Sequence, residues 1–265
     1  MKKSILPIIC IVFSLLIFNC GKPTPVSRQE IAFGTVCSIT LYEKNAEKVL
    51  EQCFFRLQEL DDIFNVNEEE SDINLINKMA GIAPATVSKE AIFVLKQAKE
   101  FAKLTNGNFD PTIGPLVKVW NINGGNPKVP NQSKIDKARS LVNFENLILN
   151  ENTYTAYIGK DMSLDVGGIA KGFAADEMVK ILSENNITYG IINLGGNIFA
   201  YGTKNTEKKG ESWNIGIKNP INPEFGSAFS VKVKNKTVVT SGNYERFFEE
   251  NGVRYHHIID VKDGY

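Results

Sequence analysis

Residues that build zinc centres and disulfide frameworks are scarce in this chain. Its 265 residues include four cysteines and two histidines, and only Cys37 and Cys53 lie beyond the N-terminal apolar segment. Nothing near these two cysteines completes a zinc ligand set. Both fall at apolar positions of an expected strand and an expected helix. We therefore predict two buried thiols, with one disulfide between them as the alternative.

An excess of charge of either sign is also missing. The 30 lysines and arginines equal the 30 aspartates and glutamates in number. The chain thus lacks a basic surplus that would track a phosphate backbone, and we expect no nucleic acid partner. No internal repeat and no linker is evident after Pro25. The length and the 43% share of hydrophobic residues are typical of one folded domain with a substantial core.

One apolar run stands out, at the N-terminus. Residues 1–19 combine Lys2 and Lys3 with an apolar stretch that is too short for a comfortable membrane span, which indicates a secretory signal peptide. Cys20 follows, and residues 20–30 include a polar stretch suited to a tether. The segment resembles a bacterial lipoprotein cleavage site. It predicts a lipidated Cys20 and a membrane-anchored protein facing the periplasm, with plain signal cleavage or a retained anchor as alternatives.

Hydrophobic periodicity divides the remainder into the strands and helices of an α+β protein. Alternating apolar residues predict strands, and apolar residues that recur every three or four positions predict helices. Expected strands cover 33–42, 189–194, 198–202, 212–217, 228–234 and 253–259, expected helices 46–60, 88–105 and 170–186, and an expected hairpin 146–158. Elements in this order favour layers of helix and sheet around one core.

The densest chemical signal precedes the last expected helix and spells DVGGIAKG, residues 165–172. Its glycines let a ligand approach the backbone, the helix N-terminus attracts anions, and Lys171 adds a positive charge. Together these features predict a pyrophosphate site. Packing and turn geometry alone also demand glycine, and the spacing differs from the dinucleotide fingerprint of a Rossmann fold.

Three further clusters carry polar groups in loops. NFDPTIGPL, residues 108–116, sets a carboxylate and a ring in a proline-stiffened loop, where Asp110 is either a binding group or a local cap. TSGNY, residues 240–244, places hydroxyls beside a glycine, as an ordinary turn also does. HHIID, residues 256–260, holds both histidines of the chain beside Asp260. In a strand only one of these histidines faces a given pocket.

Taken in order, these clusters resemble the ApbE-type FAD:protein FMN transferases. The resemblance covers nearly everything after residue 30 and rests on five segments: FGTVCSITLY, FDPTIGPLVKVW, DVGGIAKGFAAD, IINLGGNIFAYG and VVTSGNYERFFEENGVRYHHIIDVKDG. It implies an α+β fold related to the T-fold over residues 31–265. It also implies Mg²⁺-dependent transfer of FMN from FAD to a Thr or Ser hydroxyl of an exported acceptor protein, with release of AMP.

The resemblance further implies which residues contact FAD and the metal. The expected FAD contacts are Phe33, Asn67, Asn108, Phe109, Asp110, Asp165, Lys171, Gly195, Gly196, Thr240, Ser241, Gly242, His257 and Ile258. The backbone carbonyl of Gly168 is the expected metal ligand within this chain. The remaining ligands are expected beyond Tyr265, which makes the domain C-terminally incomplete. His257 and Asp165 are the candidates to take the proton of the acceptor hydroxyl.

Asn67 departs from the tyrosine that the family usually has on the adenine side of FAD. A small amide in place of an aromatic platform loosens that end of the ligand. Water then competes with the acceptor, so hydrolysis of FAD to FMN and AMP is the alternative activity. Two non-enzymatic alternatives are an FAD-binding lipoprotein without turnover and a surface scaffold that owes its glycines to folding. FAD binding without AMP formation identifies the first, and no FAD binding the second.

Overall fold

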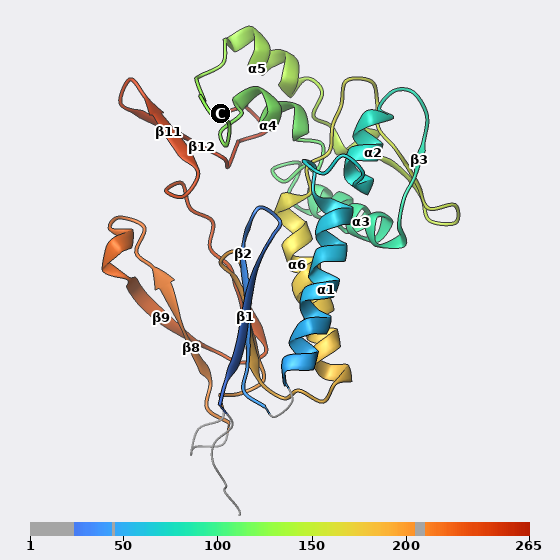
Figure 1. The fold of residues 1–265 in the computed structure, drawn as a ribbon. Helices are drawn as coiled ribbons and strands as arrows, with labels where there is room; N and C mark the ends of the chain where they lie inside the picture. The colour runs from blue at the N-terminus through green and yellow to red at the C-terminus, as the bar shows by residue number, and fades with distance from the viewer. Residues whose placement is uncertain (1–23, 44–45, 205–209) are drawn as a thin grey trace, which may run out of the picture.

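The computed structural model describes residues 24–43, 46–204 and 210–265. Figure 1 shows a central sheet beside two long helices, α1 (Ala46–Phe64) and α6 (Gly167–Glu184), with smaller helices and a hairpin at one end. The predicted signal peptide and lipidated Cys20 lie outside the described residues. Within the described ranges, no helix combines the length and apolarity needed to cross a membrane.

The central sheet has five antiparallel strands in the order β1-β2-β6-β7-β10. They are β1 (Val26–Ala32), β2 (Thr35–Leu41), β6 (Gly190–Leu194), β7 (Asn197–Tyr201) and β10 (Lys236–Val238). The tether predicted over residues 20–30 is wrong from Val26 onward, because β1 pairs along its whole length with β2. The sequence concealed this strand since its side chains are mostly polar, as suits the edge of a sheet.

Helices α1 and α6 lie side by side on one face of the sheet (Figure 1). The buried apolar residues of α1 recur at helical spacing: Ala46, Val49, Leu50, Cys53, Phe54, Leu57, Leu60 and Phe64. This stripe packs against inward-facing strand residues in the main hydrophobic core. Cys37 and Cys53 belong to it as buried free thiols, so the prediction for these two cysteines is confirmed.

A two-stranded ribbon covers part of the opposite face of the sheet. It consists of β8 (Trp213–Lys218) and β9 (Ser227–Val233), with the short helix η2 (Pro223–Phe225) between them. The Trp213 ring lies 5.5 Å from the Tyr42 ring, which stacks on Tyr189 at 5.7 Å. Burying these rings gives the ribbon a small apolar core of its own.

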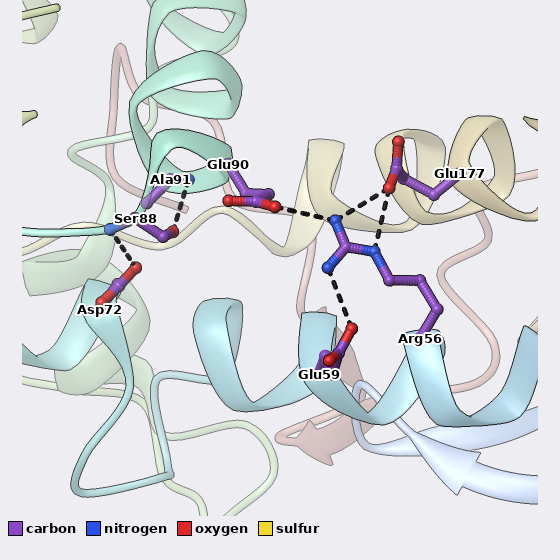
Figure 2. Close-up of polar contacts among 7 residues, drawn as sticks. All are labelled: Arg56, Glu59, Asp72, Ser88, Glu90, Ala91 and Glu177. Atoms are coloured by element: carbon purple, nitrogen blue, oxygen red, sulfur yellow. Dashed lines mark hydrogen bonds and ion pairs between the residues drawn. The ribbon is translucent and has the colours of Figure 1, made fainter. Parts of the chain in front are cut away.

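The rest of the chain adds short elements around this frame. They are α2 (Asp72–Lys78), β3 (Ala85–Thr86), α3 (Lys89–Leu104), α4 (Gly114–Trp120), α5 (Gln132–Arg139), η1 (Phe144–Asn146), β4 (Ile148–Asn150), β5 (Thr155–Tyr157), β11 (Phe247–Glu250) and β12 (Val253–His256). The expected helix over 88–105 and hairpin over 146–158 are confirmed. So is the α+β class, since helices and antiparallel strands form separate layers. Ser88 begins α3 as an N-cap that accepts a hydrogen bond from Ala91 N at 3.1 Å (Figure 2).

Arg56 links helices α1, α3 and α6 through ion pairs. From α1 its guanidinium pairs with Glu59 of the same helix, Glu90 of α3 and Glu177 of α6, at 3.1, 2.9 and 2.8 Å (Figure 2). The Arg56 side chain is 22% exposed, and those of Glu90 and Glu177 are 16% and 22% exposed. Partly buried charges with several partners hold geometry more firmly than isolated surface pairs do.

We expect Arg56→Met to lower the free energy of unfolding by about 1–2 kcal/mol, because Glu90 and Glu177 would stay partly buried without their partner. Chemical denaturation monitored by circular dichroism measures this loss. Lys103→Met is the matched control, since Lys103 pairs with Glu100 on the surface of α3. That control should change stability by no more than about 0.5 kcal/mol. Equal effects of the two substitutions would show that the Arg56 pairs do not hold the helices together.

Helices α4 and α5 pack with the β11–β12 hairpin around Trp120. Its indole Nε1 donates to the carbonyl oxygen of Gly264 at 2.6 Å, and its ring stacks on Tyr255 at 5.3 Å. The strand expected over 253–259 is too long, because β12 ends at His256. His257, the next residue, donates its backbone N–H to Arg246 O at 3.1 Å.

Candidate active site

A cleft of about 1340 Å³ opens between the N-terminal end of α6 and helices α4 and α5. Five of the predicted FAD contacts line it: Phe33, Asn67, Asp165, Lys171 and His257. They come from the β1–β2 turn, the segment after α1, the start of α6 and the segment after β12. The volume exceeds that of a typical drug-sized pocket and leaves room for a dinucleotide.

The loop that leads into α6 is fixed by hydrogen bonds to two distant segments. The side-chain amide of Asn77 in α2 makes two hydrogen bonds to the backbone of Leu164. Its Oδ1 accepts from Leu164 N at 2.6 Å, and its Nδ2 donates to Leu164 O at 3.1 Å. Asp165 N donates to Pro111 O at 2.9 Å. The Asp165 carboxylate then accepts from Gly167 N at 2.8 Å. The loop therefore presents the helix N-terminus to the cleft in one orientation, and this end of a helix favours anions.

Lys171 lies one turn into α6 and reaches back to the same end of the helix. Its ammonium donates to Gly167 O at 3.2 Å and faces the cleft. Burial, followed by the charge of Arg246, lowers the pKa of Lys171, while Cys37 and Asp165 act in the opposite sense. A lysine held in this way, at a helix N-terminus, is a preformed site for a phosphate oxygen.

The β1–β2 turn brings Phe33 to the cleft wall. Phe33 and Gly34 have φ values of +53° and +63°, the left-handed pair of a tight hairpin turn. This conformation costs energy for a bulky side chain, and the turn is held from two sides. Phe33 N donates to Asp61 Oδ1 at 2.9 Å, and Arg246 Nη2 donates to Gly34 O at 3.2 Å. Burial raises the pKa of Asp61, which the hydrogen bond from Phe33 partly offsets.

His257 and Arg246 line the same cleft as Lys171. Both ring and backbone of His257 face the Arg246 carbonyl oxygen, from Nδ1 at 3.4 Å and from the backbone N at 3.1 Å. Loss of solvation lowers the pKa of His257, and the charge of Arg246 adds to that effect. The sequence predicted contacts from the TSGNY cluster, residues 240–244, and did not predict Arg246. Its position two residues after that cluster was the available signal.

The model of the ApbE family matches residues 33–265. The chain belongs to the ApbE family. It is 36% identical to the FAD:protein FMN transferase of Treponema pallidum, over 93% of this chain and 73% of that protein. The corresponding values for a transferase of the same name from Klebsiella pneumoniae are 33%, 90% and 73%.

Solved structures of the ApbE family share the fold. The crystal structure of the ApbE protein from Thermotoga maritima is 31% identical in sequence and covers 91% of this chain and 78% of its own. Its TM-score of 0.84 shows the same arrangement of helices and sheets. The flavin transferase ApbE of Vibrio cholerae, 26% identical, covers 91% of this chain and 77% of its own, with a TM-score of 0.76.

The FDP segment, residues 109–111, stabilises this ApbE fold through the buried side chain of Asp110. The Asp110 carboxylate is buried and accepts from Thr112 N and Oγ1 at 2.8 and 2.6 Å, and from Phe144 N at 3.0 Å. These contacts fit the local-cap alternative. Asn108, Phe109 and Asp110 do not line the cleft. Asp110 is therefore placed to hold the loop that receives Asp165 N, not to contact a ligand in the cleft.

The remaining predicted contacts lie near the cleft but do not line it. Gly195 and Gly196 form the β6–β7 turn, where Gly195 N donates to Val36 O at 3.1 Å and an added Cβ would collide with Thr35. Because β10 runs antiparallel to β7, the chain leaves β10 toward this turn. The exposed Thr240 and Ser241 and the half-buried Gly242 follow at the same end of the sheet. Ile258 does not line the cleft, whereas the next residue, Ile259, does.

A magnesium ion would find few protein ligands in this part of the chain. Among the described residues, no three His, Cys, Asp or Glu side chains gather into a metal site. Gly168 is exposed in the first turn of α6, and an added Cβ there would lie 3.1 Å from the Phe109 ring. The Asp165 carboxylate and the Gly168 carbonyl would hold Mg²⁺ only together with pyrophosphate oxygens and water, a donor set that magnesium accepts.

Proposed function

We propose that this chain binds FAD in the cleft and transfers its FMN half to a Thr or Ser hydroxyl of an exported protein, releasing AMP. The observation that carries the proposal is that one cleft is lined by an aromatic ring, by a lysine at a helix N-terminus and by a histidine. In this proposal Phe33 contacts the flavin, and Lys171 and the α6 N-terminus bind the pyrophosphate. His257 lines the same cleft. Relatives that share the ApbE fold and bear the name FAD:protein FMN transferase support it.

The proposed step is a displacement at phosphorus. The acceptor oxygen forms a bond to the phosphorus of the FMN half, the bond from that phosphorus to the bridging oxygen breaks, and AMP leaves with the bridging oxygen. Lys171 offsets the charge that develops on the phosphate oxygens. Magnesium, when bound, would neutralise further charge on the same oxygens.

We assign the proton of the acceptor hydroxyl to His257. Its Nδ1 faces the Arg246 carbonyl oxygen, which favours a proton on Nδ1 and leaves Nε2 free to accept. Asp165, the other candidate, already accepts a hydrogen bond from Gly167 N on one oxygen. That contact suits Asp165 to hold the helix start and to share in metal binding.

The test is a transfer assay with FAD, Mg²⁺ and an acceptor peptide that contains one threonine. We expect the peptide to gain the mass of FMN while AMP appears in equal amount. The same peptide with valine in place of threonine should stay unmodified. Free FMN and AMP with unmodified peptide would instead identify a hydrolase, and bound FAD without AMP a carrier. A chain that binds no FAD would refute the proposal.

FAD hydrolysis is the second candidate, and Asn67 is the observation that favours it. Asn67 is exposed on the cleft, where its backbone and side-chain N–H groups donate to Asn65 Oδ1 at 3.0 and 3.3 Å. We expect Asn67→Tyr to slow FAD hydrolysis about two- to tenfold, because a ring would cover one end of the ligand and exclude water. AMP release without acceptor measures this rate. Asn152→Tyr, in an exposed loop outside the cleft, is the control, and undiminished hydrolysis in Asn67→Tyr would contradict the idea.

We also propose that the protein is an exported lipoprotein with its anchor on Cys20. The N-terminal sequence alone supports this. Mass spectrometry of the mature N-terminus tests it: a lipidated Cys20 is expected, and an intact Met1 would refute it.

A further inference from the structure

Arg246 differs from every other arginine of the chain in its partners. Arg28, Arg56, Arg139 and Arg254 each pair with at least one carboxylate. Within the described residues, Arg246 pairs with none. Its side chain donates one hydrogen bond within these residues, from Nη2 to the neutral carbonyl oxygen of Gly34. An arginine that lines a cleft with most of its donors unused is suited to bind an anion from outside the protein.

The surroundings of Arg246 add to this argument. Its guanidinium lies close enough to Lys171 and His257 to help lower the pKa of both. Asp165 is the acidic side chain that opposes this charge at Lys171. Cations that line the same cleft repel, and an anion bound among them would turn that repulsion into attraction.

We propose that Arg246 binds a phosphate group of FAD in the cleft that Lys171 also lines. This inference rests on the proposed function for the choice of FAD, but the phosphate contact itself does not. The hydrogen bond to Gly34 leaves the rest of the guanidinium fork for two phosphate oxygens. Because the Arg246 carbonyl oxygen also holds His257, one residue would set both the phosphate and the proposed proton acceptor.

The test compares three probes on purified chain by calorimetry: FAD, riboflavin and inorganic pyrophosphate. We expect Arg246→Gln to lower the affinity for FAD and for pyrophosphate about ten- to a hundredfold, the range of a lost charge-assisted contact. The affinity for riboflavin should change by no more than about twofold. Arg246→Lys should recover part of the loss. The matched control is Arg254→Gln in the neighbouring hairpin, where Arg254 pairs with Glu249 on the surface. It should bind all three probes as the unmodified chain does.

Two results would overturn the phosphate role. If Arg246→Gln lowers the affinity for riboflavin as much as the affinity for FAD, Arg246 acts by holding the Phe33–Gly34 turn. If pyrophosphate binding is absent in the unmodified chain, or unchanged in Arg246→Gln, no phosphate is bound there. A chain that binds pyrophosphate through Arg246 but takes up no FAD would instead refute the proposed function and leave the phosphate site standing.

Discussion

Substitution Lys171→Met is expected to abolish most FMN transfer, lowering the rate at saturating FAD by about a hundredfold or more. Lys171 is the ammonium held at the N-terminus of α6, with Nζ 3.2 Å from Gly167 O. Methionine keeps most of the side-chain volume and removes the charge that would stabilise the phosphates. FAD affinity should fall as well, since the same charge faces the ground-state pyrophosphate. The transfer assay and calorimetry with FAD measure the two effects.

Lys180→Met is the control for this substitution. Lys180 lies on the same helix, exposed and away from the cleft, so that variant should retain both activity and affinity. Full activity in Lys171→Met would place the pyrophosphate elsewhere and would contradict the proposed use of the DVGGIAKG segment.

Substitution His257→Gln should lower FMN transfer by about a hundred- to ten-thousandfold while FAD still binds, because glutamine fills the space but does not take the hydroxyl proton. The pH dependence gives a second readout. A base must be neutral to accept a proton, and loss of solvation lowers the pKa of His257 below its ordinary value of 6.5. Activity of the unmodified chain should therefore persist at pH 6.5 and decline only as the pH falls through that lower pKa. His257→Gln should lack this decline.

The adjacent histidine supplies the control. His256 ends β12 and lines a different pocket, beside Trp120 and Tyr265, so His256→Gln should leave the rate nearly unchanged. The acidic decline should remain and move only slightly toward higher pH, because the charge of His256 is one of the smaller causes that lower the pKa of His257. If activity of His257→Gln still declines at low pH, a group other than His257 causes that decline. Asp165 would then be the next residue to substitute.

Local pattern predicted the frame of this protein well. The apolar stripe of α1 and the extent of α3 follow from the spacing of apolar residues within each segment. β1 escaped prediction because an edge strand carries polar side chains, and its strand character comes from pairing with β2. Periodicity reports burial along one segment, and it is silent where a neighbouring strand supplies the hydrogen bonds.

The candidate site divides in the same way. Lys171, Asp165 and His257 were found because each stands in a distinctive segment, and the fold brings all three to one cleft. Asp110 also stands in a distinctive segment and was predicted to contact the ligand. Its carboxylate instead accepts hydrogen bonds from Thr112 and from Phe144, which is 34 residues away. A sequence shows that a carboxylate is present but not whether the fold has already supplied its partners.

The sequence by itself determined the family, the glycine-rich helix start and the identity of the charged groups, because these depend on residue types at short spacing. Only the tertiary structure decided what Arg246 faces. Its hydrogen bond to Gly34 joins residues 212 positions apart, and the contrast with the carboxylate-paired arginines is visible only once all of them are placed. Whether a charge is paired inside the protein or left to bind a ligand is set by what packs around it, and packing between distant segments leaves no local trace in the sequence.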